Sequence, residues 1–253
     1  MWPVLIKIGN FKIYSYGVLA FLGVLISYIL VKNLAKKENL DLKIIESLFI
    51  WSLFLGLLGG RILFILINLK NFLNSPLSYI FSRAGFAFQG GVILGIFSLY
   101  IMCKRKKINF LRVSDIFSLG LVLGHSIGRI GCFLNGCCYG KPSEKFGILF
   151  KPDSPAGALG VKVIPTQLIS SFFLFIIFLI LLRIYKRRRF SGEVFSFYLL
   201  LYGTFRFLIE FLRGDPRPFL GMFSIFQYIS MIFVGVGILN LIFLRKLFKM
   251  KRI

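Results

Sequence analysis

The chain has 253 residues, of which 57% are hydrophobic and 17% are aromatic, and its mean hydropathy is +0.84. A soluble domain of this length cannot bury so much apolar surface, so the composition indicates a polytopic membrane protein. The net charge of +23 would suit a nucleic-acid partner. However, the basic residues cluster beside apolar runs, where anionic lipid attracts each of them by about 1 kcal/mol, and we expect no nucleic acid.

Seven apolar runs of about the length that crosses a bilayer core follow one another. They cover residues 14–31, 44–68, 86–103, 114–134, 166–184, 194–212 and 223–244. The runs are continuous and do not alternate with polar residues, which excludes a β-barrel. We predict an all-α membrane protein with about seven transmembrane helices. It forms one domain over residues 1–253, with an outward-facing loop or cap at about 135–165.

The basic residues between the runs predict the orientation. One set of loops, which includes the clusters at 104–107 and 186–189, carries nineteen lysines and arginines, whereas the opposite set carries ten. Cytoplasmic loops hold the excess of basic residues, so we predict an outside N-terminus and a cytoplasmic C-terminus.

The fourth run contains Arg129, although an arginine at the centre of a membrane helix costs roughly 2.5–3.5 kcal/mol. His125, the only histidine of the sequence, and Cys132 share one helical face with it, within about 60° of rotation. Arg129 could merely snorkel to the surface, but it lies at least five residues inside the run, which favours a functional role. Glycines recur every four residues nearby, a pattern that admits a neighbouring helix: Gly120, Gly124 and Gly128.

The sixth run presents a matching stripe within about 80° of rotation: Tyr202, Arg206, Glu210 and, just beyond the run, Arg213. Arg206 and Glu210 could simply neutralise each other. With Arg61 in the second run, however, arginines outnumber carboxylates within the apolar runs, and the excess charge requires an anion. Guanidinium groups bind phosphate through paired hydrogen bonds, so a phospholipid phosphate is the expected ligand.

Two polar side chains near the ends of runs are weaker candidates. Gln89 precedes Gly90 and Gly91 in the third run, and Tyr16 begins the first run. A tyrosine at this depth usually belongs to the aromatic belt of the membrane interface.

Three cysteines, Cys132, Cys137 and Cys138, are separated by gaps of five and one. Zinc motifs need C-x₂₋₄-C spacing and four ligands, so we predict no metal. An outward position would permit a disulfide or redox role, and a packing role for these small residues is equally open.

In chain order, the motifs resemble those of the prolipoprotein diacylglyceryl transferase family: YSYG (14–17), GGRI (59–62), AFQGG (87–91), GRIGCFLNGCCYGK (128–141), PTQL (165–168) and YGTFRFLIEFLR (202–213). The fourth resembles the family signature G-R-[IL]-G-N-F-x-N-G-E-x-x-G-R, with Cys132 and Cys137 at its Asn and Glu positions, as in a cysteine-rich branch of the family. Gln89 stands where many members have histidine, and Ile169 and Ser170 replace a usual Tyr-Glu pair.

The resemblance implies a multi-pass enzyme of the bacterial plasma (inner) membrane that uses no cofactor. Such an enzyme transfers a diacylglyceryl group from phosphatidylglycerol to the lipobox cysteine of a prolipoprotein, forms a thioether and releases glycerol phosphate, the first step of lipoprotein maturation. The resemblance assigns the lipid phosphate to Arg129 and Arg206. It matches further motif positions to Tyr16, Asn135, Gly140, Glu210 and Arg213.

Within this interpretation His125 or Glu210 would be the general base, if one is needed. Arg61, Gln89 and Tyr202 complete the residues expected to contact the lipid. Two other classes of function stay open from the sequence: a transporter or binder of an anionic lipid, and a thiol oxidoreductase built on the three cysteines.

Overall fold

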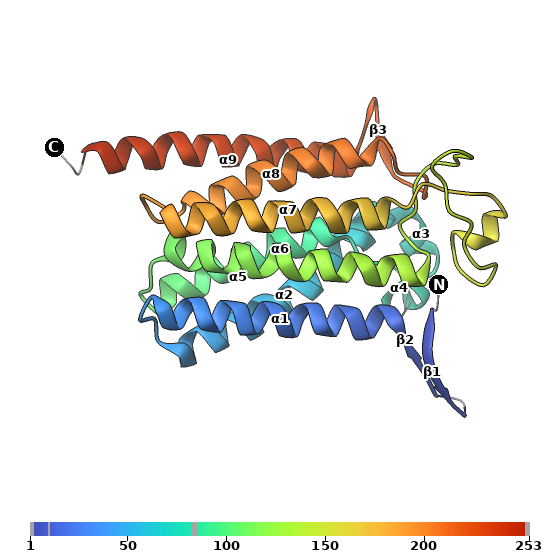
Figure 1. The fold of residues 1–253 in the computed structure, drawn as a ribbon, viewed down its shortest axis with the longest axis horizontal. Coiled ribbons are helices and arrows are strands. Elements are labelled where there is room, and N and C mark those ends of the chain that lie inside the picture. Colours follow the sequence, from blue (N-terminus) through green and yellow to red (C-terminus); the bar gives the residue numbers. More distant parts are fainter. Residues whose placement is uncertain (1–2, 10, 82–84, 251–253) are drawn as a thin grey trace. The chain divides into compact units, whose positions relative to one another are not determined.

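The computed structural model describes residues 3–9, 11–81 and 85–250, and long helices dominate these ranges (Figure 1). Each of the seven predicted runs overlaps one long helix: α1 (Ser15–Lys37), α2 (Leu42–Ile67), α5 (Phe88–Arg105), α6 (Phe110–Asn135), α7 (Thr166–Arg187), α8 (Glu193–Glu210) and α9 (Ile225–Met250). Three basic residues counted for the orientation, Arg83, Lys251 and Arg252, lie outside the described residues.

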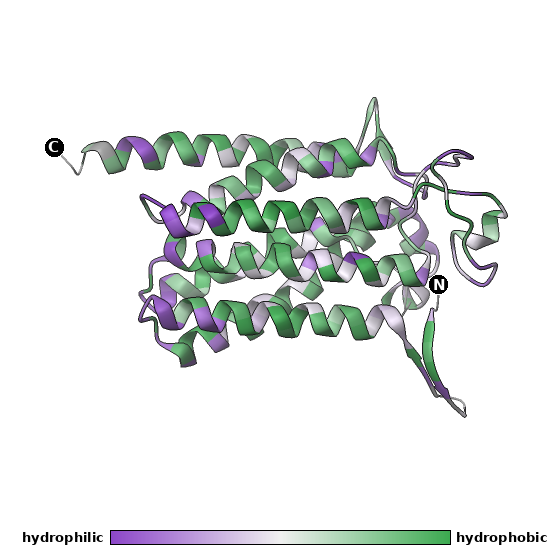
Figure 2. Ribbon diagram, in the orientation of Figure 1, coloured by the Kyte–Doolittle hydropathy of each residue, from purple (hydrophilic) through white to green (hydrophobic). Residues whose placement is uncertain are grey.

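Five of the described helices are long and apolar enough to cross a membrane: α1, α2, α6, α7, and α9 over Ile225–Phe248. The chain is therefore a mostly helical, multi-pass membrane protein. The other two long helices, α5 and α8, have only 18 residues each and carry charged residues at their ends, Arg105 in α5 and Glu193 and Glu210 in α8. In Figure 2 the middles of the long helices are mostly green, and purple gathers towards helix ends and loops.

Short elements that the all-α prediction did not include lie between the long helices. Strands β1 (Val4–Ile8) and β2 (Phe11–Tyr14) form an antiparallel hairpin, and so do β3 (Phe219–Leu220) and β4 (Phe223–Ser224). The remaining short elements are α3 (Leu69–Asn74), α4 (Pro76–Phe81) and the 3-10 helix η1 (Gly157–Leu159).

The chain folds into two compact units. The first unit runs to Val31 and resumes at Asp115, and the second unit comprises Lys32–Ser114. In the second unit, α2 and α5 pack with their backbones in close contact at glycines. A Cβ on Gly59 would lie 2.6 Å from the carbonyl oxygen of Gly90, and one on Gly91 would lie 2.8 Å from that of Gly56. Side chains at these positions would force the helices apart.

In the first unit, the glycines of α6 allow α1 to pack closely against it, as the small-residue pattern predicts. A Cβ on Gly23 of α1 would lie 2.8 Å from the carbonyl oxygen of Gly124, and Ser27 Oγ donates to the Gly120 carbonyl at 2.7 Å. Gly128 differs, because a Cβ there would meet nothing within 4 Å. The small-residue pattern therefore marks the α1–α6 contact over two of its three turns.

Helix α6 is also tied to α7 and α8 by polar contacts. Ser126 and Ser171 each donate a hydroxyl hydrogen bond to the other's carbonyl oxygen, at 2.8 and 2.9 Å. The buried carboxylate of Asp115 accepts the backbone N–H groups of Gly192 and Phe195, both at 2.9 Å. This carboxylate therefore caps the start of α8, where free N–H groups and the helix dipole favour an anion.

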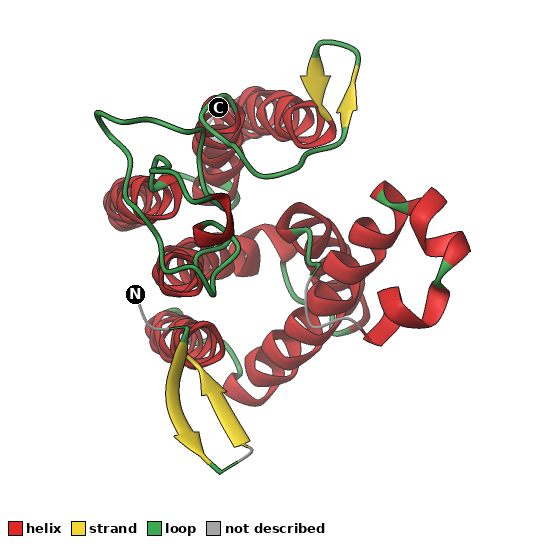
Figure 3. Cartoon of the chain, turned by 90° about the vertical axis from the view of Figure 1, so that its right-hand side faces the viewer, coloured by secondary structure: helices red, strands yellow, loops and turns green. Residues whose placement is uncertain are grey.

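The loop 136–165 has a small core of its own. Tyr139, Phe150, Ala156 and Val163 are buried together, and Val163 pairs as an isolated bridge with Ile148. Figure 3 looks onto the end of the first unit from which this loop emerges, with η1 in front. The loop is thus a packed element and not a loose connection.

Candidate functional site

Arg129, the first arginine of the candidate site, lies in the last turns of α6. Its Nε donates to His125 Nε2 at 3.1 Å, one helical turn earlier. The His125 ring meets the ring of Tyr202 on α8 edge to face, with centroids 5.7 Å apart, and Tyr202 stacks on Tyr198 at 5.5 Å. The predicted faces of α6 and α8 therefore meet, and His125 orients the Arg129 side chain between them.

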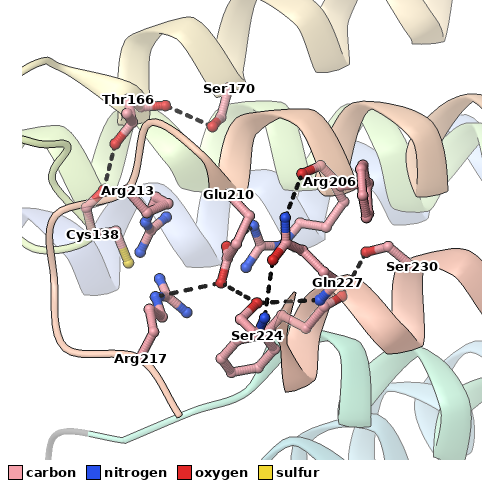
Figure 4. A network of polar contacts seen from close by, with 12 residues as sticks. Cys138, Thr166, Ser170, Arg206, Glu210, Arg213, Arg217, Ser224, Gln227 and Ser230 are labelled. Atoms are coloured by element: carbon pink, nitrogen blue, oxygen red, sulfur yellow. Dashed lines mark hydrogen bonds and ion pairs between the residues drawn. The ribbon is translucent and has the colours of Figure 1, made fainter. Parts of the chain in front are cut away.

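Arg206 and Glu210 form the buried centre of the site on α8 (Figure 4). Arg206 Nη1 lies 2.5 Å from Glu210 Oε2, and the two residues are only 6% and 7% exposed. The other carboxylate oxygen of Glu210 accepts the hydroxyl of Ser224 at 2.9 Å. Ser224 is held in turn by Gln227, whose Oε1 accepts the Ser224 N–H at 2.9 Å. Both oxygens of Glu210 are therefore engaged.

Beyond α8, Arg213 and Arg217 share one carboxylate. Asp215 accepts two hydrogen bonds from Arg213, both at 2.7 Å, and two from Arg217, at 3.3 and 2.8 Å. Arg217 also lies 3.9 Å from Glu210. The guanidinium groups of Arg206 and Arg217 both lie over the ring of Phe226, at 5.5 and 4.9 Å from its centroid. We call Arg206, Arg213, Arg217, Glu210 and Asp215 the arginine cluster.

The charges of this region do not balance. Within the described residues, the arginine cluster contains three guanidinium groups and two carboxylates. Arg129 is electrostatically linked to it, because the charges of Arg213 and Arg129 both act on the thiol of Cys138. Even when Cys138 is ionised, four guanidinium groups face three anions. At least one positive charge remains for an external anion, and phosphate is an anion that a guanidinium group binds through paired hydrogen bonds.

The three clustered cysteines lie beside these arginines. Cys132 is buried in the last turn of α6, and Cys137 and Cys138 follow the helix. Hydrogen bonds from the thiols of Cys132 and Cys137, and then the charges of Arg213 and Arg129, hold the pKa of Cys138 well below its usual range, although burial opposes them. The hydrogen bond with Cys132 lowers the pKa of Cys137. The hydrogen bond between Cys137 and Cys138, together with burial, outweighs it and raises the pKa of Cys137 to about 11. The two neighbouring thiols and the two arginines thus favour ionisation of Cys138 over that of Cys137.

The start of α7 fixes the backbone of this cysteine segment. Thr166 Oγ1 donates to the carbonyl of Cys138 at 2.8 Å, and Gln167 Nε2 donates to that of Cys137 at 2.7 Å. These residues belong to the PTQL motif. Ser170, which stands in place of a usual glutamate, donates to the Thr166 carbonyl at 2.6 Å and stays within its own helix.

Other predicted residues of the first unit surround the site. Asn135 ends α6, and its side chain contacts Cys137. Gly140 pairs with Arg213 in an antiparallel bridge, and the N–H of Lys141 donates to the Leu212 carbonyl at 2.9 Å. Tyr16 lies near the end of α6, because a Cβ on Gly131 would be 3.3 Å from its Cα. Loop 136–165 and the end of α8 are thus joined at the arginine cluster.

Arg61 and Gln89 belong to the second unit. Arg61 donates to the carbonyls of Gly85, at 2.7 Å, and of Tyr79 and Ile80. Backbone oxygens therefore stabilise this guanidinium inside its own unit. Gln89 is buried in the first turn of α5. The expected contacts of both residues with lipid stay predictions.

Sequence reasoning missed Asp215 and Arg217, together with Ser224 and Gln227. The signal for the first two was the run Arg213-Gly-Asp-Pro-Arg217, with alternating charges at every second position. A separate cavity of about 270 Å³ lies at the opposite end of α8, lined by Arg183, Ile184, Arg187, Glu193 and Phe197. None of the predicted site residues lines it.

The comparisons with known proteins agree with the motifs. The family described as Prolipoprotein diacylglyceryl transferase matches residues 3–243. A phosphatidylglycerol–prolipoprotein diacylglyceryl transferase of Clostridium tetani is 38% identical and covers 97% of this chain and 100% of its own. The enzyme numbered 2 from Clostridium perfringens is 37% identical over 92% and 91%, and one from Finegoldia magna is 34% identical over 93% of each chain.

Proposed function

Because the chain belongs to the prolipoprotein diacylglyceryl transferase family, we propose that it transfers a diacylglyceryl group from phosphatidylglycerol to the lipobox cysteine thiol of prolipoproteins. The names of the relatives specify phosphatidylglycerol as the lipid donor and a prolipoprotein as the acceptor. The observation that supports this function in the structure is the excess of buried guanidinium over carboxylate around Arg206.

The transfer is a nucleophilic substitution at a glyceryl carbon. The acceptor thiolate forms the C–S bond, the C–O bond to phosphate breaks, and the bonding electrons leave with glycerol phosphate; the thiol proton is lost to solvent or to a nearby base. During this step a phosphodiester with one negative charge becomes a monoester with more charge. Guanidinium groups therefore bind the departing phosphate more tightly than the donor lipid, which lowers the barrier.

We assign the phosphate to Arg129 and Arg206, with Arg213 adding positive potential. His125 is better suited to position Arg129 than to act as a base, since its Nε2 already accepts a hydrogen bond from that residue. Glu210 likewise has both oxygens engaged and keeps Arg206 in place. A dedicated base need contribute little, because positive potential favours the acceptor thiolate itself.

The proposal includes the membrane arrangement of a plasma-membrane enzyme: seven spans, with α5 and α8 crossing as well, an outside N-terminus and a cytoplasmic C-terminus. The uneven distribution of basic residues between the two sets of loops supports it. We also treat residues 1–253 as one functional domain, with loop 136–165 facing outward beside the arginine cluster.

The test uses the purified full-length protein in detergent, labelled phosphatidylglycerol and a lipobox peptide. We expect a thioether-linked diacylglyceryl peptide and one glycerol phosphate for each transfer, both detected by mass spectrometry. A matched peptide with serine in place of the lipobox cysteine should give neither product. Lipid that binds but is never transferred to the cysteine peptide would indicate a lipid binder or transporter instead.

A further inference from the structure

The sulfur atoms of Cys132, Cys137 and Cys138 form a cluster that no part of the proposed reaction uses. The three Sγ atoms all lie within 4.8 Å of one another. Three sulfurs bound to one Zn²⁺ with Zn–S bonds of about 2.3 Å are roughly 3.8–4.0 Å apart. The cluster therefore comes close to the geometry of a three-thiolate metal site without a change in the path of the chain.

The backbone holds this geometry from both sides. Gly136 and Cys138 have φ angles of +69° and +63°, so the chain turns back on the end of α6 and brings Cys137 and Cys138 to Cys132. The Cys137 N–H donates to the Cys132 carbonyl at 3.2 Å. Side chains of α7 hold the carbonyls of Cys137 and Cys138. The spacing that argued against a metal in the sequence is thus overcome by a tight turn.

The surroundings also suit a buried anionic complex. Three thiolates and one divalent ion carry a net charge of −1. Arg213 lies beside the Cys138 sulfur (Figure 4) and the charge of Arg129 acts on the same atom. Two positive groups thus stabilise the complex, which a buried charge requires.

We propose that Cys132, Cys137 and Cys138 bind one thiophilic metal ion, Zn²⁺ being the probe of choice, with the fourth position open to water. Three cysteines with an open position are a ligand set that Zn²⁺ accepts. The ion would tie the end of α6 to the segment 137–140, whose last residue pairs with Arg213. Metal binding at this site can be tested without measuring the proposed transfer reaction.

The test uses the full-length protein, purified in detergent under reducing and metal-free conditions and then dialysed against Zn²⁺. We expect one Zn²⁺ per chain, X-ray absorption showing three sulfur neighbours at about 2.3 Å, and a thiolate-to-metal absorption band when Cd²⁺ replaces Zn²⁺. Excess Zn²⁺ should raise the Tm by roughly 5–10 °C.

The variants Cys132→Ser, Cys138→Ser and the triple Cys132→Ser/Cys137→Ser/Cys138→Ser should lose the band and the rise in Tm. Cys103→Ser is the matched control, because Cys103 is a buried free cysteine of the second unit, and it should behave as the wild type. The X-ray absorption needs no variant, so fewer than three sulfur neighbours in the wild type would overturn the proposal. So would a disulfide among these cysteines in the untreated protein, or equal Zn²⁺ binding by the triple variant.

Discussion

At the scale of single residues, Arg206 and Glu210 form a buried ion pair. A buried ion pair by itself needs no ligand, and its two members could serve only to neutralise each other. Here Glu210 has a second cation, Arg217, at 3.9 Å. Arg206 is therefore not the only cation near Glu210, which is consistent with the proposal that Arg206 also binds a lipid phosphate.

We predict that Arg206→Gln and the double variant Arg206→Gln/Glu210→Gln both lose transfer by at least about 100-fold, the usual cost of removing one stabilising donor from a transition state. The double variant removes the ion pair without leaving a carboxylate unpaired, and so separates phosphate binding from neutralisation. Initial rates with labelled lipid, alongside the Tm in detergent, check this. Recovery of transfer in the double variant would contradict a role in binding phosphate.

Helical spacing predicts which side chains of one helix lie together. Arg129 contacts His125, and Arg206 contacts Glu210, because a spacing of four residues places each pair on one face. Asp215 and Arg217 were missed, since no helical period orders the segment after α8. The sulfur cluster was missed for the same reason: the turn at Gly136, with φ +69°, cannot be derived from cysteine spacing.

At the scale of elements, loop 136–165 depends on its junction with the end of α8. A Cβ on Gly140 would lie 2.8 Å from the Cβ and carbonyl oxygen of Ile164 and 2.8 Å from the carbonyl oxygen of Leu212. Backbone atoms cannot move aside as a flexible side chain does. The junction therefore requires glycine at this position.

We predict that Gly140→Ala lowers the Tm by roughly 2–10 °C, since overpacking costs about 1–3 kcal/mol, and that it also slows transfer by displacing Arg213. Gly235→Ala in α9 is the matched control, because a Cβ there meets nothing within 4 Å. It should leave the transfer rate unchanged and should not lower the Tm, since alanine favours a helix more than glycine does. A Gly140→Ala protein with wild-type Tm and rate would show that the junction tolerates a side chain.

The sequence predicts the long helices better than the short elements. Continuous apolar runs locate the seven long helices of the described residues to within a few residues, except that α1 and α9 extend about six residues further into basic segments. The first hairpin had a local signal, Gly9-Asn10 between two apolar runs, which was overridden by the all-α expectation. The close α2–α5 contact needs both GGRI and AFQGG, and their pairing is not readable from either motif alone.

At the scale of the whole molecule, the uneven distribution of lysine and arginine between the two sets of loops is what predicts the orientation of the chain in the membrane. The basic clusters 104–107 and 186–189 lie at the C-terminal ends of α5 and α7, and in the proposed topology these segments stay on the cytoplasmic side. Loop 136–165 would then face outward, on the side where a prolipoprotein presents its lipobox.

We predict that Lys151→Cys is labelled by a membrane-impermeant maleimide in intact cells, whereas Lys106→Cys is labelled only after the membrane is permeabilised. Both lysines are exposed in the structure, so access to the reagent depends on the side of the membrane. Labelling is measured above that of the unsubstituted chain, which has its own cysteines. The reverse pattern would invert the proposed topology.

Arg213 and Arg217 both donate to the carboxylate of Asp215, and this sharing matters for turnover. In the proposed reaction Arg213 adds positive potential near the headgroup, and Asp215 stays paired with Arg217 even if Arg213 shifts towards the lipid. Asp215, whose side chain is 19% exposed, is thus not left without a cation, and the cost of an unpaired, partly buried charge is avoided. Under the proposed function, exchange of lipid for product would then cost only rearranged hydrogen bonds at this carboxylate.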